Sequence, residues 1–242
     1  MNSQEPSGAT RRRGGSRHRR VIPMIEAVLL AVAIAAPAVL ADRPELLTLA
    51  TNILILSLLA LSFDLCWGYA GIMSFGQALF FGAAGYVVAV LGRDFGFSQL
   101  WGALPLAALV GGIIAALLAA FLLLGRSTPT TVFVALGTLT GAYAAERFVS
   151  GWEYVGAGNG VSSVRLLAAG GYEFAEGIAF YLLALFISLA FYVVARLVVK
   201  SQFGLVLAGV RQNEERLAFL GYRVAVFKAL VFSFAGVMAC VS

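Results

Sequence analysis

The sequence is short of charge, histidine and cysteine. Of its 242 residues only 12% are charged, whereas a soluble domain averages about 25%. With 61% hydrophobic residues, it has too little polar surface to stay dissolved as a monomer. The single histidine, His18, and the two cysteines, Cys66 and Cys240, form no cluster. Because no nucleophile–base pair is apparent either, we expect no metal site and no catalytic residue, and hence not an enzyme.

The phosphate-binding pattern Gly-x-x-x-x-Gly-Lys-Ser/Thr is also missing from the chain. The glycine-rich run VGAGNGVSS does not replace it, because no strand precedes the run and no Lys-Ser/Thr follows it. We therefore expect the chain to bind no nucleotide of its own.

Long apolar runs are what the sequence has in abundance. A transmembrane helix needs about 20 apolar residues to cross a hydrocarbon layer about 30 Å thick. Seven runs reach or approach that length, and they are 21–41, 46–66, 71–91, 100–123, 129–148, 177–198 and 225–242. The runs are continuous rather than alternating, which predicts helices that satisfy their backbones internally. We expect an all-α fold, a polytopic transmembrane helical bundle with about seven spans.

The distribution of positive charge predicts the orientation. With the N-terminus in the cytoplasm, the outer segments carry only Arg43, Arg93, Arg147 and Arg165, and most acidic residues also lie outside. Residues 1–20 then form a basic, disordered cytoplasmic tail, and 21–242 form the transmembrane domain with a cytoplasmic loop at 199–226. The positive charges are concentrated where this membrane topology would place them. The net charge of +5 therefore gives no reason to expect a nucleic-acid partner.

Two alternatives concern the ends of the chain. The tail and first run resemble a signal peptide with AVLA as cleavage site, although the apolar region is longer than a usual signal core. The last run stops at Ser242 with no polar cap or flanking charge, so a C-terminally truncated chain is the other alternative.

The run SFDLCWGYAGIMSFGQALFFGAAGY, residues 62–86, places glycines and polar side chains at membrane depth. Glycine permits close helix approach in lipid and irregular backbone beside a cavity. An ionisable group such as Asp64 faces a water path or a bundle interior, or reaches the interface from the end of its span. Candidate residues for the translocation pathway or helix packing are Asp64, Gly68, Tyr69, Gly71, Ser74, Gly76, Gln77, Gly82 and Gly85. The spacing of GTLTG at 137–141 also predicts close helix packing, with no partner specified.

The loop at 199–226 is charged and amphipathic. A short helix here would have Arg211, Glu214 and Glu215 near its start and Gly221 as its C-terminal stop. Leu217 and Leu220 would enter a groove on a partner protein, with the charged face in water. The alternative is an interfacial helix that lies on lipid.

Both segments resemble those of the branched-chain amino acid ABC importer permeases, which have urea-type permeases as close relatives. The first matches that family's glycine-rich signature at Gly68, Tyr69, Gly71, Ser74, Gly76, Gln77, Phe80, Gly82, Gly85 and Tyr86. The second matches its coupling motif at Phe203, Gly204, Ala208, Arg211, Asn213, Glu214, Leu220, Gly221, Lys228, Ser233, Ala235 and Gly236. The match departs from the family at Glu215, Arg216 and Leu217, where small apolar residues are preferred. The resemblance covers roughly 45–242.

The resemblance implies a permease fold and a transport role in the inner membrane. The ATPase-coupling loop would consist of Arg211, Asn213, Glu214, Glu215, Leu220, Gly221 and Lys228. No cofactor would be bound by this chain, and ATP-Mg would sit on partner ATP-binding cassette subunits. A second homologous permease chain would share the pore. An external solute-binding protein would meet the 149–176 loop, where Gly156, Gly158 and Gly160 match the family only roughly.

The same resemblance implies translocation of branched-chain amino acids by alternating access. Urea or a short amide is the alternative substrate, and a truncated, non-transporting remnant is the alternative role. A self-sufficient channel or secondary transporter would need charges at the bilayer centre, which only Glu26 and Asp64 approach. It would also leave the charged loop without a purpose.

Overall fold

The computed structural model describes residues 15–97, 99–124, 130–162, 164, 167–175 and 177–242. Helices make up most of this part, in the order α1 (Gly15–Val39), α2 (Pro44–Asp64), α3 (Gln77–Asp94), α4 (Leu100–Leu123), α5 (Thr131–Gly151), α6 (Ile178–Lys200), α7 (Gln202–Gln212), α8 (Glu214–Phe219) and α9 (Val224–Val241). A π-helical turn, Leu65–Tyr69, extends α2. The predicted all-α fold is confirmed.

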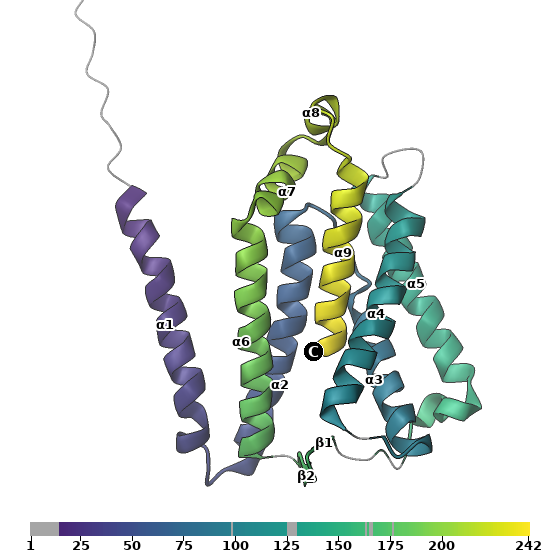
Figure 1. Cartoon of the computed structure of the whole chain (residues 1–242). Coiled ribbons are helices and arrows are strands. Elements are labelled where there is room, and N and C mark those ends of the chain that lie inside the picture. The colour runs from purple at the N-terminus through teal and green to yellow at the C-terminus, as the bar shows by residue number, and fades with distance from the viewer. Residues whose placement is uncertain (1–14, 98, 125–129, 163, 165–166, 176) are drawn as a thin grey trace, which may run out of the picture.

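The long helices lie side by side and run up and down (Figure 1). Helices α7 and α8 lie at one end of the bundle, where α1 also begins. The connections α1–α2, α3–α4 and α5–α6 lie at the other end. Of the arginines expected outside, Arg43, Arg93 and Arg147 belong to these far-end segments, whereas Arg165 lies outside the described residues. The alternation therefore puts the start of α1 and the 199–226 loop at the same end.

The tightest packing of the bundle joins α4 and α9 through small residues. A Cβ added to Gly111 would overlap with the Sγ of Cys240, and one added to Gly236 would overlap with the Cβ of Ala115. Beside this contact, the rings of Phe80 and Phe232 meet edge to face, with centroids 5.7 Å apart. Small residues let helix backbones approach closely in lipid, where van der Waals contact rather than water exclusion drives association.

Four helices of the described part are long and apolar enough to cross a membrane by composition alone, and they are Pro44–Tyr69, Leu100–Leu123, Ile178–Lys200 and Val224–Val241. Met24–Val39 is a shorter apolar stretch. Helices α3 and α5 are not among these four, because their glycines and polar residues lower their mean hydropathy. Large apolar side chains on the outer faces of the helices are exposed, including Phe121 and Trp101 on α4. Such faces fit a lipid environment, and the chain is a multi-pass membrane protein.

The structure differs from the sequence expectations in three places. Helix α1 begins at Gly15, within the tail predicted for 1–20, of which residues 1–14 lie outside the described residues. The third run is helical only from Gln77, because 70–76 leave the helix. The 149–176 loop also contains two-residue strands, β1 (Ala168–Ala169) and β2 (Tyr172–Glu173), which pair antiparallel.

Candidate functional site

The glycine-rich run forms a break between two helices. After α2 the chain winds one π turn, leaves the helix at Ala70 and re-enters it at Gln77. Gly71 has a φ of +70°, a conformation that favours glycine, and Gly68 packs against the Asp64 side chain. The Ile72 N–H donates to the Cys66 carbonyl at 2.9 Å and closes the turn. Single π turns are rare inside helices and frequent at functional sites.

Side chains from the run and from α5 hold the break in place. The Phe75 N–H donates to Thr138 Oγ1 at 3.0 Å, and the Gly76 N–H donates to Ser74 Oγ at 3.2 Å. Thr138 was not expected as a partner from the sequence. It lies within the GTLTG run, whose small-residue spacing was the signal, and a Cβ on Gly76 would lie 3.3 Å from it.

Gln77 begins α3 and is 5% exposed. Its Nε2 donates to Cys66 Sγ at 3.6 Å, and its Oε1 has no hydrogen-bond partner among the described residues. Gly82 and Gly85 lie further along α3, with no atom within 4 Å of an added Cβ. Close packing therefore does not require glycine at these two positions, in contrast to Gly111 and Gly236.

The 199–226 loop contains two helices rather than one. Arg211 lies in the last turn of α7, not at the start of the second helix as expected. Asn213 caps α8, because its side chain accepts a hydrogen bond from the Arg216 N–H at 2.9 Å. Glu214 and Glu215 form the first turn of α8, where negative charge suits the helix dipole. Gly221, with a φ of +87°, ends the segment as predicted.

The apolar side of α8 differs from the expectation. Leu217 packs back onto α7, since a Cβ on Gly209 would lie 2.8 Å from its side chain. Leu220 is 69% exposed and Phe219 is 91% exposed. The large apolar side chains exposed at the end of α8 are therefore Phe219 and Leu220, whereas Leu217 is half-buried against α7.

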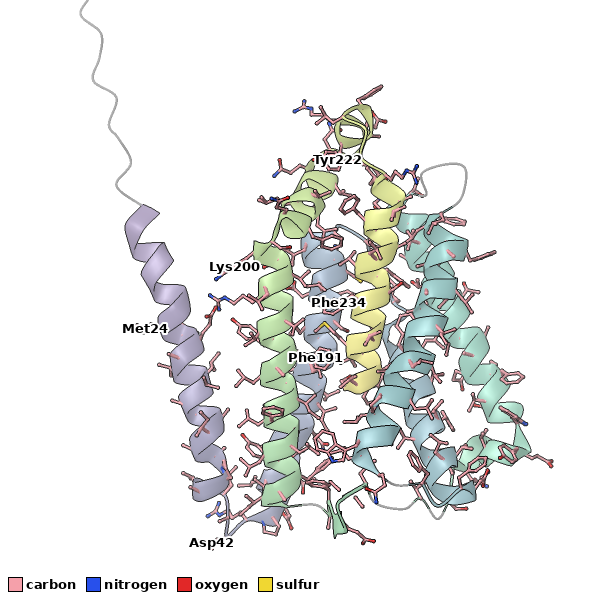
Figure 2. All side chains as sticks on the ribbon, in the orientation of Figure 1. Met24, Asp42, Phe191, Lys200, Tyr222 and Phe234 are labelled. Carbon is pink, nitrogen blue, oxygen red and sulfur yellow. The ribbon has the colours of Figure 1, made fainter. Side chains whose placement is uncertain are left out.

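Aromatic packing and an ion pair fasten the loop to α9. The ring of Phe227 lies 5.5 Å from that of Phe203 and 6.2 Å from that of Tyr222, which Figure 2 places just below α8. Lys228 Nζ donates to Glu214 Oε2 at 2.5 Å, with side chains 12% and 28% exposed. The first residue of α8 is thus tied to the first turns of α9.

Arg211 connects the loop to the glycine-rich break. Its guanidinium donates to the Gly68 carbonyl, and a Cβ on Gly71 would lie 3.3 Å from Arg211 Cγ. A side chain at position 71 would therefore crowd the arginine. The two segments that stand out in the sequence, more than a hundred residues apart, meet at this contact.

An open cavity of about 730 Å³ lies at the junction. Its lining comes from both segments and consists of Asp64, Gly68, Tyr69, Ala208, Arg211 and Gln212. Asp64, the last residue of α2, is exposed here. No group of three or more histidine, cysteine or acidic side chains that could hold a metal occurs in the described part of the chain.

The opposite end carries a separate polar cluster. Arg93 pairs with Asp94 at 2.6 Å and donates to the Tyr154 carbonyl at 2.7 Å, and the Tyr154 hydroxyl donates to Asp94. Hydrogen bonds, first from Arg93 and then from Tyr154, lower the pKa of Asp94 to about 2. The bond to Asp94 raises the pKa of Tyr154. The cluster fastens the start of the 149–176 loop to α3.

The glycines of that loop shape a tight local turn. Gly156 and Gly160 have φ values of +84° and +75°, and a Cβ on Gly156 would overlap with the Gly160 carbonyl. Gly158 has no atom within 4 Å of an added Cβ. The turn therefore needs glycine at position 156, because the backbone there has a positive φ and a side chain would collide with the Gly160 carbonyl.

A family model described as "Branched-chain amino acid transport system / permease component" matches residues 45–242. The match includes the glycine-rich break and the 199–226 loop. No curated protein and no solved structure matches the chain.

Proposed function

The chain belongs to the family of branched-chain amino acid transport permease components, and we propose that it is the membrane subunit of an ATP-driven importer. The contact of Arg211 with the Gly68 carbonyl is the observation that carries this proposal. It joins the cytoplasmic loop of the proposed topology to the irregular backbone within the bundle. A force applied to the loop therefore has a direct route to the break.

The force would come from a separate ATP-binding cassette subunit that carries ATP-Mg. Its groove would receive Phe219 and Leu220, the exposed large apolar residues at the end of α8, in a helix-in-groove contact. A shift of α8 would pull α9 through the Glu214–Lys228 pair and the break through Arg211. Glu215, exposed on the first turn of α8, would face the cassette subunit or water.

The translocation path would run past the break. Irregular backbone at membrane depth is tolerated where it is buried in protein or lines a cavity, and the cavity of about 730 Å³ lies beside Gly68 and Tyr69. In the proposed alternating access, this cavity is the inward-facing mouth. Asp64 and Arg211 then flank the exit of the solute, and a second homologous permease chain completes the pore.

The charge bias supports the proposed orientation. Loops that remain in the cytoplasm carry an excess of lysine and arginine, so the start of α1 and the 199–226 loop would lie inside. The chain would then lie in the inner membrane. The Arg93–Asp94–Tyr154 cluster and its loop would face outward, where a solute-binding protein delivers a branched-chain amino acid.

Uptake of labelled leucine tests the proposal. Cells that express the chain with its partner subunits should take up leucine, cells without the chain should not, and unlabelled valine should compete. Gly221→Pro should abolish uptake without preventing membrane insertion, because the loop can no longer end α8 at a positive φ. Gly158→Ala, at an open position of the outer loop, is the matched glycine control.

Leucine uptake that is the same with and without the chain would refute branched-chain amino acids as its substrate. Competition by urea alone would point to the urea-type relatives instead. Normal uptake by Gly221→Pro would refute the role given to the loop.

A further inference from the structure

Helix α1 stands apart from the rest of the bundle. In Figure 1 it leans away from α6 toward its N-terminal end, and it has few residue contacts with α2 and α6. The space between them is a cleft of about 540 Å³, within the roughly 300–1,000 Å³ typical of ligand pockets. Its lining is mostly aliphatic and includes Leu29, Leu30, Leu54, Leu58, Leu61, Leu185 and Leu189.

The two serines in the cleft donate their hydroxyl protons to the backbone. Ser57 Oγ donates to the Leu54 carbonyl at 2.7 Å, and Ser188 Oγ donates to the same carbonyl at 3.3 Å. A groove with mostly aliphatic walls and few free hydrogen-bond donors favours an apolar occupant over water. At membrane depth, the apolar material at hand to fill such a cleft is a lipid acyl chain.

A polar cavity of about 320 Å³ adjoins one end of the cleft and shares Glu26, Leu61 and Tyr192 with it. The Glu26 carboxylate pairs with the Arg196 guanidinium, which also donates to the Tyr192 hydroxyl at 2.7 Å. These three side chains therefore satisfy one another at the junction of the two cavities.

Two further charged groups line the polar cavity, Lys200 at the end of α6 and Asp64 at the end of α2. Neither makes an ion pair within the part of the chain that the structure describes. Figure 2 shows Lys200 extending from α6 on the side where α1 stands. The cavity thus holds one cation and one anion without an ion-pair partner beside an apolar cleft, and Lys200 also acts electrostatically on Glu26 across it.

We propose that a phospholipid with a zwitterionic headgroup occupies both cavities, with its phosphate at Lys200, its ammonium at Asp64 and an acyl chain between α1 and α2/α6. Charge complementarity selects the headgroup, and the aliphatic lining of the cleft of about 540 Å³ selects a lipid over a small zwitterionic solute. The lipid would fix α1 to the bundle. The inference rests on the chain spanning a membrane and not on the proposed transport role.

Lipid retention by the purified full chain tests the proposal. The chain would be exchanged into detergent with added phosphatidylethanolamine or phosphatidylglycerol, and bound lipid would be counted by native mass spectrometry. Wild type should retain phosphatidylethanolamine. Lys200→Gln should retain it about tenfold more weakly through loss of a charge-assisted hydrogen bond, and Lys200→Arg should keep it.

A second pair of variants separates a specific site from general lipid coating. Ala27→Trp fills the cleft and should reduce retention, whereas Ala60→Trp adds the same ring at an exposed α2 position outside the cleft and should leave retention unchanged. Size-exclusion profiles and thermal midpoints identify variants that fail to fold. The proposal is overturned if wild type retains no lipid, if it prefers phosphatidylglycerol, or if Lys200→Gln and Ala27→Trp retain lipid as wild type does.

Discussion

Reversing the charge of Glu214 would break the ion pair that ties α8 to α9. Lys228 Nζ lies 2.5 Å from Glu214 Oε2, and the side chains are 12% and 28% exposed. Exposed pairs contribute about 0–1 kcal/mol, whereas hydrogen bonds to charged groups contribute about 1.5–3 kcal/mol. This half-buried pair lies between the two, at about 1–2 kcal/mol.

Glu214→Lys replaces this attraction by repulsion between two ammonium groups, one of which is mostly buried. We expect a loss of about 2 kcal/mol in the stability of the docked loop, a factor of about thirty in its population. Thermal unfolding of the purified chain measures the stability. Stimulation of ATP hydrolysis in liposomes that also contain the cassette subunits measures the coupling, and it should fall.

The exchange variant, with Glu214→Lys and Lys228→Glu together, restores opposite charges at the same two positions. It should recover most of the loss, with a coupling energy of about 1–2 kcal/mol in the double-mutant cycle. Glu215→Lys is the matched control for the stability measurement, because Glu215 is exposed and makes no ion pair among the described residues. A coupling energy near zero in the double-mutant cycle, or an equal loss of stability in Glu215→Lys, would refute the pairing as the link between α8 and α9.

Three further changes test the fold. Gly71→Ala puts a side chain at a φ of +70° and should lower the free energy of unfolding by about 1–2 kcal/mol, measured by thermal unfolding. Gly111→Ala forces α4 and α9 apart and should cost about 1–3 kcal/mol, partly recovered when Cys240→Ala is added. Tyr154→Phe removes a donor to Asp94 and should raise the pKa of that carboxyl from about 2. Because this pKa lies below the unfolded value of about 4, the stability it brings is present above pH 4 and lost toward pH 2. As the pH falls, Tyr154→Phe should lose this stability at a higher pH than wild type does. Thermal midpoints measured over a series of acidic pH values would record the difference.

Controls for the glycine changes come from the same chain. Gly85→Ala adds a methyl group where no atom lies within 4 Å of it, and it should leave the thermal midpoint unchanged or slightly raised. If Gly85→Ala destabilises the chain as much as Gly111→Ala, close approach of α4 and α9 does not explain the cost. If wild type and Tyr154→Phe lose stability at the same acidic pH, the hydrogen bond from Tyr154 does not lower the pKa of Asp94.

Much of the fold was predictable because a bilayer constrains it strongly. Runs of about 20 apolar residues must be helical in lipid, so the helices follow from hydropathy and their alternation follows from chain order. The C-terminal stop at Gly221 was predictable for a local reason, since glycine adopts a positive φ without strain. The break at 70–76 was foreseen only as irregular backbone. Its boundaries depend on Thr138, which belongs to another helix.

The order of residues along the chain is enough to establish the membrane class of this protein, its likeness to a permease family and the two segments that stand out from the apolar runs. That these two segments touch follows from the folded arrangement alone, because Arg211 lies at the end of α7 and reaches the Gly68 carbonyl. The folded arrangement also shows that Leu217 packs against α7 while Phe219 is exposed, and that Gly111 rather than Gly85 permits close helix packing. The physical reason is the same in each case. Hydropathy and turn propensity are local properties, whereas side-chain direction and helix spacing depend on the neighbour that a helix meets.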